Sequence, residues 1–505
     1  MRTKNTIKNI LMNFLNNIVL NLLRFVSRIV FVKVLSELYL GVNGLLSNVL
    51  GLLALSELGI GTAIGFSLYK PLATEDKNKL SSLMRFYKKA YRIIFVVVVV
   101  LGIILLPFLP YLIKDDTSGI ANLNIIYLIF LANMAIGYLF SYKRTLINAD
   151  QKNYKITPII IAYNFLTTVL QIIVLVIFKN YIIYLLMQTI CIVLENLTVN
   201  AYINKHYPFL KELDKAPKID NNELTSIKKN VEALMLHKVG SYVVTSTDNI
   251  IITKFIGLVT TGIYSNYSLI VGMIGNFIYT FISNTIASFG NLVASETTER
   301  RLRVFNEANF ICYIFYGIST ICLVNLLSPF IGFVFGKKFI IDSLVVYIVC
   351  INFYVTGMTS IANMVQTASG LYRKDKYVPL IQSVINLAVS IYFAIRIGLA
   401  GVFIGTIVSS LLPFFFKPVI IYKYVFETNV KEYFKEFLKQ TIIIVVSFFI
   451  SFYLISLFKV SIIIEIIIRL FLSVFVPTIL IYLCYHKTNQ YKNVLGRIKS
   501  VLKRS

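Results

Sequence analysis

The sequence predicts an all-α polytopic membrane protein with about fourteen transmembrane helices, built as two six-helix lobes and two additional C-terminal helices. Its 505 residues are 57% hydrophobic and only 14% charged, and the mean hydropathy is +0.77. A soluble chain could not cover so much apolar surface, whereas lipid accepts it. Apolar runs near twenty residues recur, for example from Ile93 and from Thr441. Because backbone groups in hydrocarbon must be satisfied internally, and alternating barrel-type strands are absent, we expect helices.

The expected spans follow the apolar runs in order, and the even number of spans places both termini on the same side. They lie near 10–32, 38–67, 92–113, 121–141, 157–178, 181–203, 237–256, 260–290, 305–328, 343–367, 379–397, 399–421, 441–458 and 461–484.

The net charge of +26 would ordinarily suggest nucleic acid as a partner, but the positions of the charges argue against it. With the N-terminus in the cytoplasm, most of the 49 Lys and Arg residues fall in or beside cytoplasmic segments. This asymmetry is the positive-inside rule, so the basic charge mainly encodes topology. We therefore expect a multi-pass protein of the plasma membrane with both termini cytoplasmic, and no nucleic-acid partner.

An enzymatic or metal-dependent role is not expected. The five cysteines stand alone in predicted helices, and the three histidines are not clustered, so neither metal nor redox chemistry is indicated. No GxxxxGK[ST] phosphate loop is present, and the external loops are too short for a catalytic domain with paired acids. The sequence predicts no cofactor and no catalytic residue.

An internal repeat divides the chain. Shifting the sequence against itself by 221 residues aligns loops with loops and the Pro-started span 157–178 with 379–397. The identities at this offset include Lys33 with Lys254, Gly41 with Gly262, Ser47 with Ser268, Gly51 with Gly272, and Pro158 with Pro379. Since six helices separate equivalents, the halves share one orientation, as in a parallel pseudo-twofold repeat. The expected domains are residues 1–220, 221–426 and 427–505, the last holding two additional helices and a basic tail.

The first predicted helix carries the most informative polar residues. Asn17, Asn21, Arg24 and Arg28 recur at intervals of three or four and so share one face. An arginine within a span normally faces a cavity or a partner. One interpretation is a strip that binds an anionic head group such as a diphosphate, because guanidinium offers bidentate contacts. The other is that these side chains join the helix to its neighbours by hydrogen bonds.

The repeat mate of this helix places Thr245 at the position equivalent to Arg24, as a further candidate for substrate binding, with Asp248 on the same face. Asp248 could bind a coupling proton or cation, or could pair with one of the two arginines. In the second span, Glu57 follows a stripe of small residues and is a candidate for gating or ion coupling. In the last span, Glu465 and Arg469 are spaced for a structural salt bridge.

Two segments resemble a known family. "RIVFVKVLSELYLGVNGLLSNVLGLLALSELGIGTAIGFSLYKPLATED" (28–76) resembles the opening of Wzx-type polysaccharide flippases, and "TDNIIITKFIGLVTTGIYSNYSLIVGMI" (247–274) resembles the start of their second half. These flippases belong to the multidrug/oligosaccharidyl-lipid/polysaccharide exporter superfamily. The resemblance implies a cationic cavity between two lobes, alternating access, and translocation of undecaprenyl-diphosphate-linked oligosaccharide. Lipid II flippases of the superfamily also carry arginines in their first helix and two extra C-terminal helices.

These observations together predict a flippase for a lipid-linked precursor of capsule, exopolysaccharide or another cell-surface glycan. Its expected partners are that lipid-linked glycan, the bilayer, H⁺ or Na⁺, and the polymerase and glycosyltransferases of the same pathway. The alternatives are a lipid II flippase or a drug or cation antiporter of the same fold. A cavity for cationic drugs should be acidic, which Arg24 and Arg28 oppose.

Overall fold

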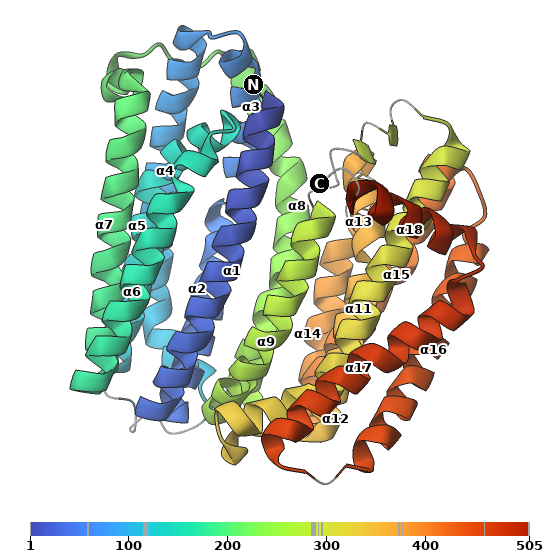
Figure 1. Ribbon diagram of the computed structural model, residues 1–505. Coiled ribbons are helices and arrows are strands. Elements are labelled where there is room, and N and C mark those ends of the chain that lie inside the picture. Colours follow the sequence, from blue (N-terminus) through green and yellow to red (C-terminus); the bar gives the residue numbers. More distant parts are fainter. Residues whose placement is uncertain are drawn as a thin grey trace. The chain divides into compact units, whose positions relative to one another are not determined.

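The computed structural model describes residues 2–57, 60–114, 120, 122–283, 289–290, 292–293, 296–371, 374–375, 377–458 and 460–502. Over these residues the chain is helical almost throughout and forms no β-strand (Figure 1). It folds as two compact units, Met1–Ser265 and Asn266–Ser505, which are described separately below.

The first unit contains the N-terminal helices and the beginning of the second sequence repeat. Its elements are α1 (Arg2–Val34), α2 (Glu37–Leu53), η1 (Ala54–Glu57), α3 (Ile60–Ala73), α4 (Lys77–Leu105), η2 (Leu106–Leu112), α5 (Leu123–Ala149), η4 (Asn153–Lys155), α6 (Thr157–Phe178), α7 (Tyr181–His206), η5 (Pro208–Lys215), α8 (Asn221–Ile251), the π-helical turn η6 (Ile252–Ile256) and the first part of α9 (Leu258–Ser283).

The second unit begins within α9 and contains the remaining helices. These are α11 (Thr298–Val334), η7 (Lys337–Phe339), α12 (Ser343–Met358), α13 (Ser360–Ala368), α14 (Val378–Ile397), α15 (Leu399–Ile421), the π-helical turn η9 (Tyr422–Phe426), α16 (Lys431–Ser456), α17 (Ile462–Tyr485) and α18 (Asn489–Leu502). The three-way division expected from the repeat, at residues 220 and 426, concerns internal symmetry and stays a prediction.

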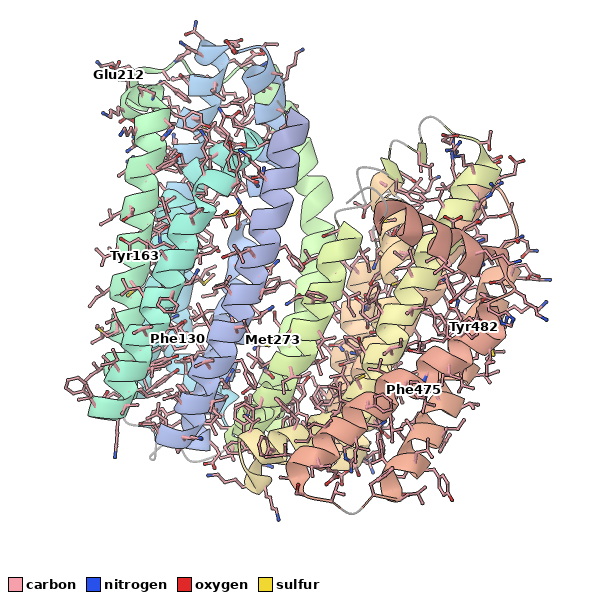
Figure 2. All side chains as sticks on the ribbon, in the orientation of Figure 1. Phe130, Tyr163, Glu212, Met273, Phe475 and Tyr482 are labelled. Atoms are coloured by element: carbon pink, nitrogen blue, oxygen red, sulfur yellow. The ribbon has the colours of Figure 1, made fainter. Side chains whose placement is uncertain are left out.

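The helices are long and apolar enough to confirm a polytopic membrane protein. Among the described residues, eleven helices meet the length and hydropathy needed to cross a bilayer. The three other predicted spans are helical too: 38–67 is divided into α2, η1 and α3, while 237–256 falls mostly within α8 and 260–290 begins as α9. Large apolar side chains are exposed on these helices, as Phe475 and Tyr482 of α17 show in Figure 2. Such side chains face lipid in a membrane protein.

Helix α1 is held along α6 by one of its faces. Near its N-terminal end, the Asn9 side chain donates to Gln151 O (2.8 Å) and accepts from Tyr154 N (2.7 Å), which fastens α1 to the turn before α6. These bonds fix how α1 is rotated about its axis. They therefore determine where its row of asparagines and arginines points.

At the other end of the unit, two lysines fasten the end of η2 to η6. Lys114 Nζ donates to Phe255 O (3.1 Å), and Lys254 Nζ donates to Tyr111 O. The backbone adds a third bond, from Lys114 N to Thr253 O (3.2 Å). Carbonyl groups at a helix end lack intrahelical donors and attract cations, which explains why lysines occupy both positions.

A close backbone approach in the first unit joins the repeat-equivalent glycines Gly41 of α2 and Gly262 of α9. A Cβ built on Gly41 would lie 2.1 Å from Leu258 O, and one on Gly262 would lie 2.5 Å from Glu37 O and 2.8 Å from Gly41 N. Equivalent residues meet each other where a twofold axis passes between them. The contact is therefore what a parallel pseudo-twofold repeat requires at its axis.

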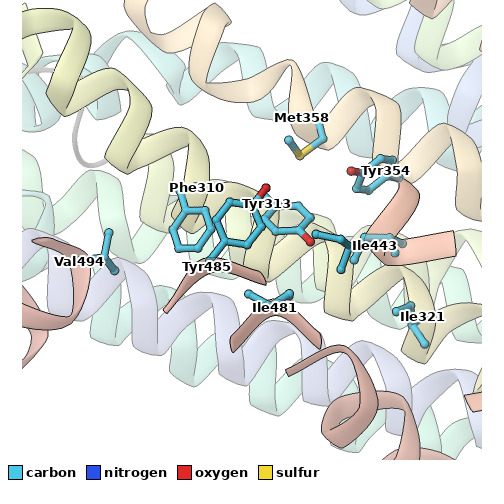
Figure 3. Packing of buried hydrophobic residues seen from close by; sticks show 10 residues of the cluster. Phe310, Tyr313, Ile321, Tyr354, Met358, Ile443, Ile481, Tyr485 and Val494 are labelled. Carbon is cyan, nitrogen blue, oxygen red and sulfur yellow. The ribbon is translucent and has the colours of Figure 1, made fainter. Parts of the chain in front are cut away.

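The two helices added after the second repeat pack on α11. The core of this region joins Phe310 and Tyr313 of α11 to Ile443 of α16 and to Ile481 and Tyr485 of α17 (Figure 3). A polar network lies beside it. Asn325 Nδ2 donates to Ser451 Oγ (3.0 Å) and Ser473 Oγ (2.9 Å).

Arg469 completes this network. It donates through Nη1 to Asn325 O (3.0 Å) and through Nε to Glu465 Oε1 (2.8 Å). The Glu465–Arg469 salt bridge predicted from the spacing is confirmed, with Nη2 2.6 Å from the same carboxylate oxygen. The salt bridge lies within α17, and the bond from Arg469 to Asn325 O joins α17 to α11.

We predict that Gly41→Ala destabilises the protein. The new methyl group would meet a backbone carbonyl rather than a flexible side chain, and overpacking of this kind costs about 1–3 kcal/mol or more. The matched control is Gly272→Ala on α9, because no atom lies within 4 Å of its Cβ position. Thermal unfolding in detergent should show a lower midpoint for Gly41→Ala only. Equal midpoints for both variants would contradict the close packing.

Candidate functional site

The polar face of α1 has unpartnered side chains. Arg24 and Asn17 are exposed, while Asn21 and Arg28 are partly buried. Within the part of the chain that the structure describes, Asn17, Asn21 and Arg24 form no hydrogen bond or ion pair with another residue. The face is thus not joined to neighbouring helices along most of its length. Its amide and guanidinium donors are available to a ligand.

Arg28 lies among polar and aromatic side chains of α7 and α9. Its Nη1 donates to Ser265 Oγ (3.2 Å), and that hydroxyl donates in turn to Gly262 O (2.6 Å). The rings of Tyr181 and Tyr184 stand close to the guanidinium and interact with it electrostatically. No carboxylate within the described ranges forms an ion pair with Arg28. The positive charge is therefore held by neutral groups only.

The aromatic side chains beside Arg28 pack against one another and form hydrogen bonds with neighbouring residues. Phe31 meets Tyr181 and Tyr184 edge to face, with ring centroids 5.5 Å apart in each case. Asn43 Nδ2 donates to the Tyr181 hydroxyl (3.1 Å), and the Tyr184 and Ser27 hydroxyls are 3.5 Å apart. Arg28 is therefore enclosed by side chains that contact one another. Arg24, one turn away on α1, is exposed.

Two further candidates, Asp248 and Thr245, lie on α8, the repeat equivalent of α1. Of these two, the structure describes the side chain of Asp248 only. Asp248 is partly buried in α8 and interacts electrostatically with Tyr264 of α9. In the described residues no ion pair joins Asp248 to Arg24 or Arg28. The side chain of Thr245 lies outside the described residues.

Glu57 lies at the break between α2 and α3 and lines a cavity of about 300 Å³. Its Oε1 accepts a hydrogen bond from the Tyr91 hydroxyl (2.9 Å). The cavity wall is completed by Gly61, Gly65, Tyr69, Thr145, Asn148 and Ala149. A carboxylate with hydroxyl and amide neighbours can hold a proton or accept hydrogen bonds from a polar ligand.

A second cavity, of about 430 Å³, lies between α2, α5 and α8. Its lining is Ser47, Leu50, Gly51, Ala54, Phe130, Met134, Gly137, Tyr138, Ser141 and Tyr242. Sequence reasoning missed this cavity, together with Tyr91 and Ser265. The sequence gives no signal that distinguishes Tyr91 from the other tyrosines. The partners of Tyr91 and Ser265, Glu57 and Arg28, lie on helices that are distant in sequence.

Glu195 of α7, by contrast, has a structural partner. Arg144 Nη2 of α5 lies 2.7 Å from Glu195 Oε1 and 3.1 Å from Asn196 Oδ1. The adjacent Lys143 is buried and donates to Asn204 Oδ1 (2.8 Å) and to Asn200. These bonds join α5 to α7 and fix the rotation of α5 about its axis.

We predict that Arg144→Ala destabilises the first unit by about 1–3 kcal/mol, because it leaves the mostly buried Glu195 carboxylate unpaired. Adding Glu195→Gln should recover part of the loss, since a neutral amide tolerates burial better than an unpaired charge. Thermal unfolding in detergent of Arg144→Ala, Glu195→Gln and the double variant measures this. If the loss of stability in the double variant equals the sum of the two single losses, the ion pair does not have the assigned role.

The sequence matches no family model, and it matches no curated protein. Solved structures do match. The lipid II flippase MurJ in an inward closed conformation has a TM-score of 0.63 at 15% identity, covering 93% of this chain and 99% of that one. An inward-facing multidrug resistance MATE family transporter of the MOP superfamily has a TM-score of 0.60 at 13% identity, covering 79% of this chain and 94% of its own.

A MATE transporter of Vibrio cholerae has a TM-score of 0.59 at 13% identity and covers 85% of this chain and 98% of its own. At identities this low, the structural similarity shows a shared fold and nothing more specific. The chain therefore has the helical membrane-transporter fold seen in these MATE and lipid II flippase structures.

Proposed function

We propose that this protein is a flippase that moves an undecaprenyl-diphosphate-linked oligosaccharide repeat unit from the inner to the outer leaflet by alternating access. The product would serve synthesis of capsule, exopolysaccharide or a related cell-surface glycan. The observation that carries the proposal is the pair of arginines in the first span, which have no carboxylate partner among the described residues. The fold supports it at the coarser level of a transporter or flippase.

An unpaired guanidinium within the hydrocarbon region is costly, so such a residue is retained where it meets an anion or a water-filled cavity. Arg24 and Arg28 are one helical turn apart, which puts two forked donors within reach of one diphosphate. Asn17 and Asn21 extend the same face by two further turns and offer amide donors beside the phosphates.

In this proposal the protein lies in the plasma membrane with both termini in the cytoplasm, and the head group enters from the cytoplasmic side. The cycle then needs an energy source, and H⁺ or Na⁺ is the proposed coupling ion. Asp248 and Glu57 are the carboxylates proposed to bind it, because both are partly buried on helices of the first unit. The chain acts as a transporter rather than an enzyme, alongside the polymerase and glycosyltransferases of its pathway.

Lipid II is the second candidate substrate, because it is the cargo named for the matching flippase structure and also carries a diphosphate. A drug or cation antiporter is favoured only by the likeness to MATE transporters. A cationic drug would be repelled by Arg24 and Arg28. The charge on α1 thus favours a lipid diphosphate over a cationic drug.

We predict that Arg24→Ala and Arg28→Ala each abolish export of the surface glycan while the protein still inserts in the membrane. Arg24→Lys should keep partial activity, because it retains charge but loses the bidentate fork. Lys33→Ala is the matched control, since it removes an exposed cation from the last turn of the same helix. Surface glycan in a complemented knockout, with protein quantified in membranes, measures the effect. Normal glycan in both arginine variants would refute the proposal.

A further inference from the structure

One face of α5 lines both cavities of the first unit. The residues concerned are Phe130, Met134, Gly137, Tyr138, Ser141, Thr145, Asn148 and Ala149. Their spacing by three or four, with two adjacent pairs, is that of one helical face. At 1.5 Å per residue the face extends for roughly 28 Å, close to the thickness of the hydrocarbon core. We call this face, with the side chains opposite it, the α5 track.

The two cavities adjoin each other along the track. Ala54 of the larger and Glu57 of the smaller belong to the same turn η1, and Ser141 and Thr145 are one turn apart on α5. Tyr138 of the larger cavity interacts electrostatically with Glu57 of the smaller. The two cavities are therefore neighbours along the same face of α5.

The walls of the track do not suit a phosphate. Among the residues that the structure describes, neither lining includes a lysine, an arginine or a histidine, and the one charged side chain is the carboxylate of Glu57. A diphosphate placed there would be repelled by this charge and would find no cation among these residues to offset its desolvation. The arginines of α1 suit the anionic part of the cargo better.

The same walls suit an uncharged ligand rich in hydroxyl groups. Ser141 and Thr145 donate their hydroxyl protons to backbone carbonyls one turn earlier, which leaves their oxygens as acceptors. Asn148 adds an amide that donates and accepts. Aromatic rings of Phe130, Tyr138 and Tyr242 supply flat apolar surface in the larger cavity. Sugars present both kinds of surface, with hydroxyl groups at the ring edge and C–H groups on its faces.

We infer that the α5 track binds the neutral sugar residues of the head group, while Arg24 and Arg28 bind its diphosphate. This inference rests on the proposed function and adds to it a separate site that selects for the glycan. The cavity volumes of about 430 Å³ and 300 Å³ fall within the range of small-molecule sites, about 300–1,000 Å³. The larger cavity takes the sugars that stack on its rings.

Gly137 provides the test, because no atom lies within 4 Å of its Cβ position. A Cβ added there meets no neighbouring atom, Gly137 lines the larger cavity, and the substitution removes a glycine from a helix interior. Gly137→Leu should therefore fold and fill the track. The matched control is Ala132→Leu, which places the same side chain at an exposed position of α5 that lines neither cavity.

Binding to purified protein is measured with two probes, undecaprenyl diphosphate alone and an undecaprenyl-diphosphate-linked disaccharide. Gly137→Leu should weaken binding of the disaccharide-linked probe by about tenfold or more and change binding of the sugar-free probe less than about twofold. Arg28→Ala should weaken both probes. If Gly137→Leu does not fold, Tyr242→Leu, which removes a ring from the cavity, should show the same selective loss.

Equal losses for both probes in the Gly137→Leu variant, or the same loss in Ala132→Leu, would overturn the inference. So would an unchanged affinity for the disaccharide-linked probe in folded Gly137→Leu. Failure of the proposed function is distinct, because the wild-type protein would then bind neither probe.

Discussion

The architecture depends on the close approach of two glycines, Gly41 in α2 and Gly262 in α9. Neither leaves room for a Cβ, so the backbones of α2 and α9 meet at positions that are equivalent in the sequence repeat. Close contact of this kind is how membrane helices associate when the hydrophobic effect offers no drive between them. Ser265, which bonds Arg28, follows Gly262 by one turn. The contact between α2 and α9 therefore also positions a partner for the arginine.

Two places in the first unit differ in the charge they carry. Arg28 of α1 bonds a neutral hydroxyl, whereas the described lining of the two cavities along α5 includes a carboxylate and no cation. Arg144 and Lys143 are also on α5, but they are neutralised or solvated by side chains of α7 and stay out of the cavities. An amphiphilic cargo with an anionic and a neutral part matches this division. A cargo of uniform charge does not.

Sequence patterns predicted the fold well, because bilayer thickness and the need to satisfy backbone groups leave few alternatives. The helices, the two additional helices at the end and the Glu465–Arg469 pair are all local or periodic features, and all are present. The division of the predicted span 38–67 into α2, η1 and α3 was not predicted from the sequence. From the sequence, Glu57 is a candidate for gating or ion coupling, and the structure adds the cavity that this residue lines beside the break.

The sequence by itself determined that the chain is a helical membrane protein, that it repeats, and that one face of α1 carries asparagines and arginines. These properties depend on the hydropathy of each segment, on identities between residues 221 positions apart, and on helical spacing. All three are patterns of the linear sequence. The tertiary structure decided which of those polar groups have partners. Arg28 bonds Ser265, 237 positions away, whereas Arg24 bonds none of the described residues. Partners and cavities arise from helices distant in sequence, so no local pattern encodes them.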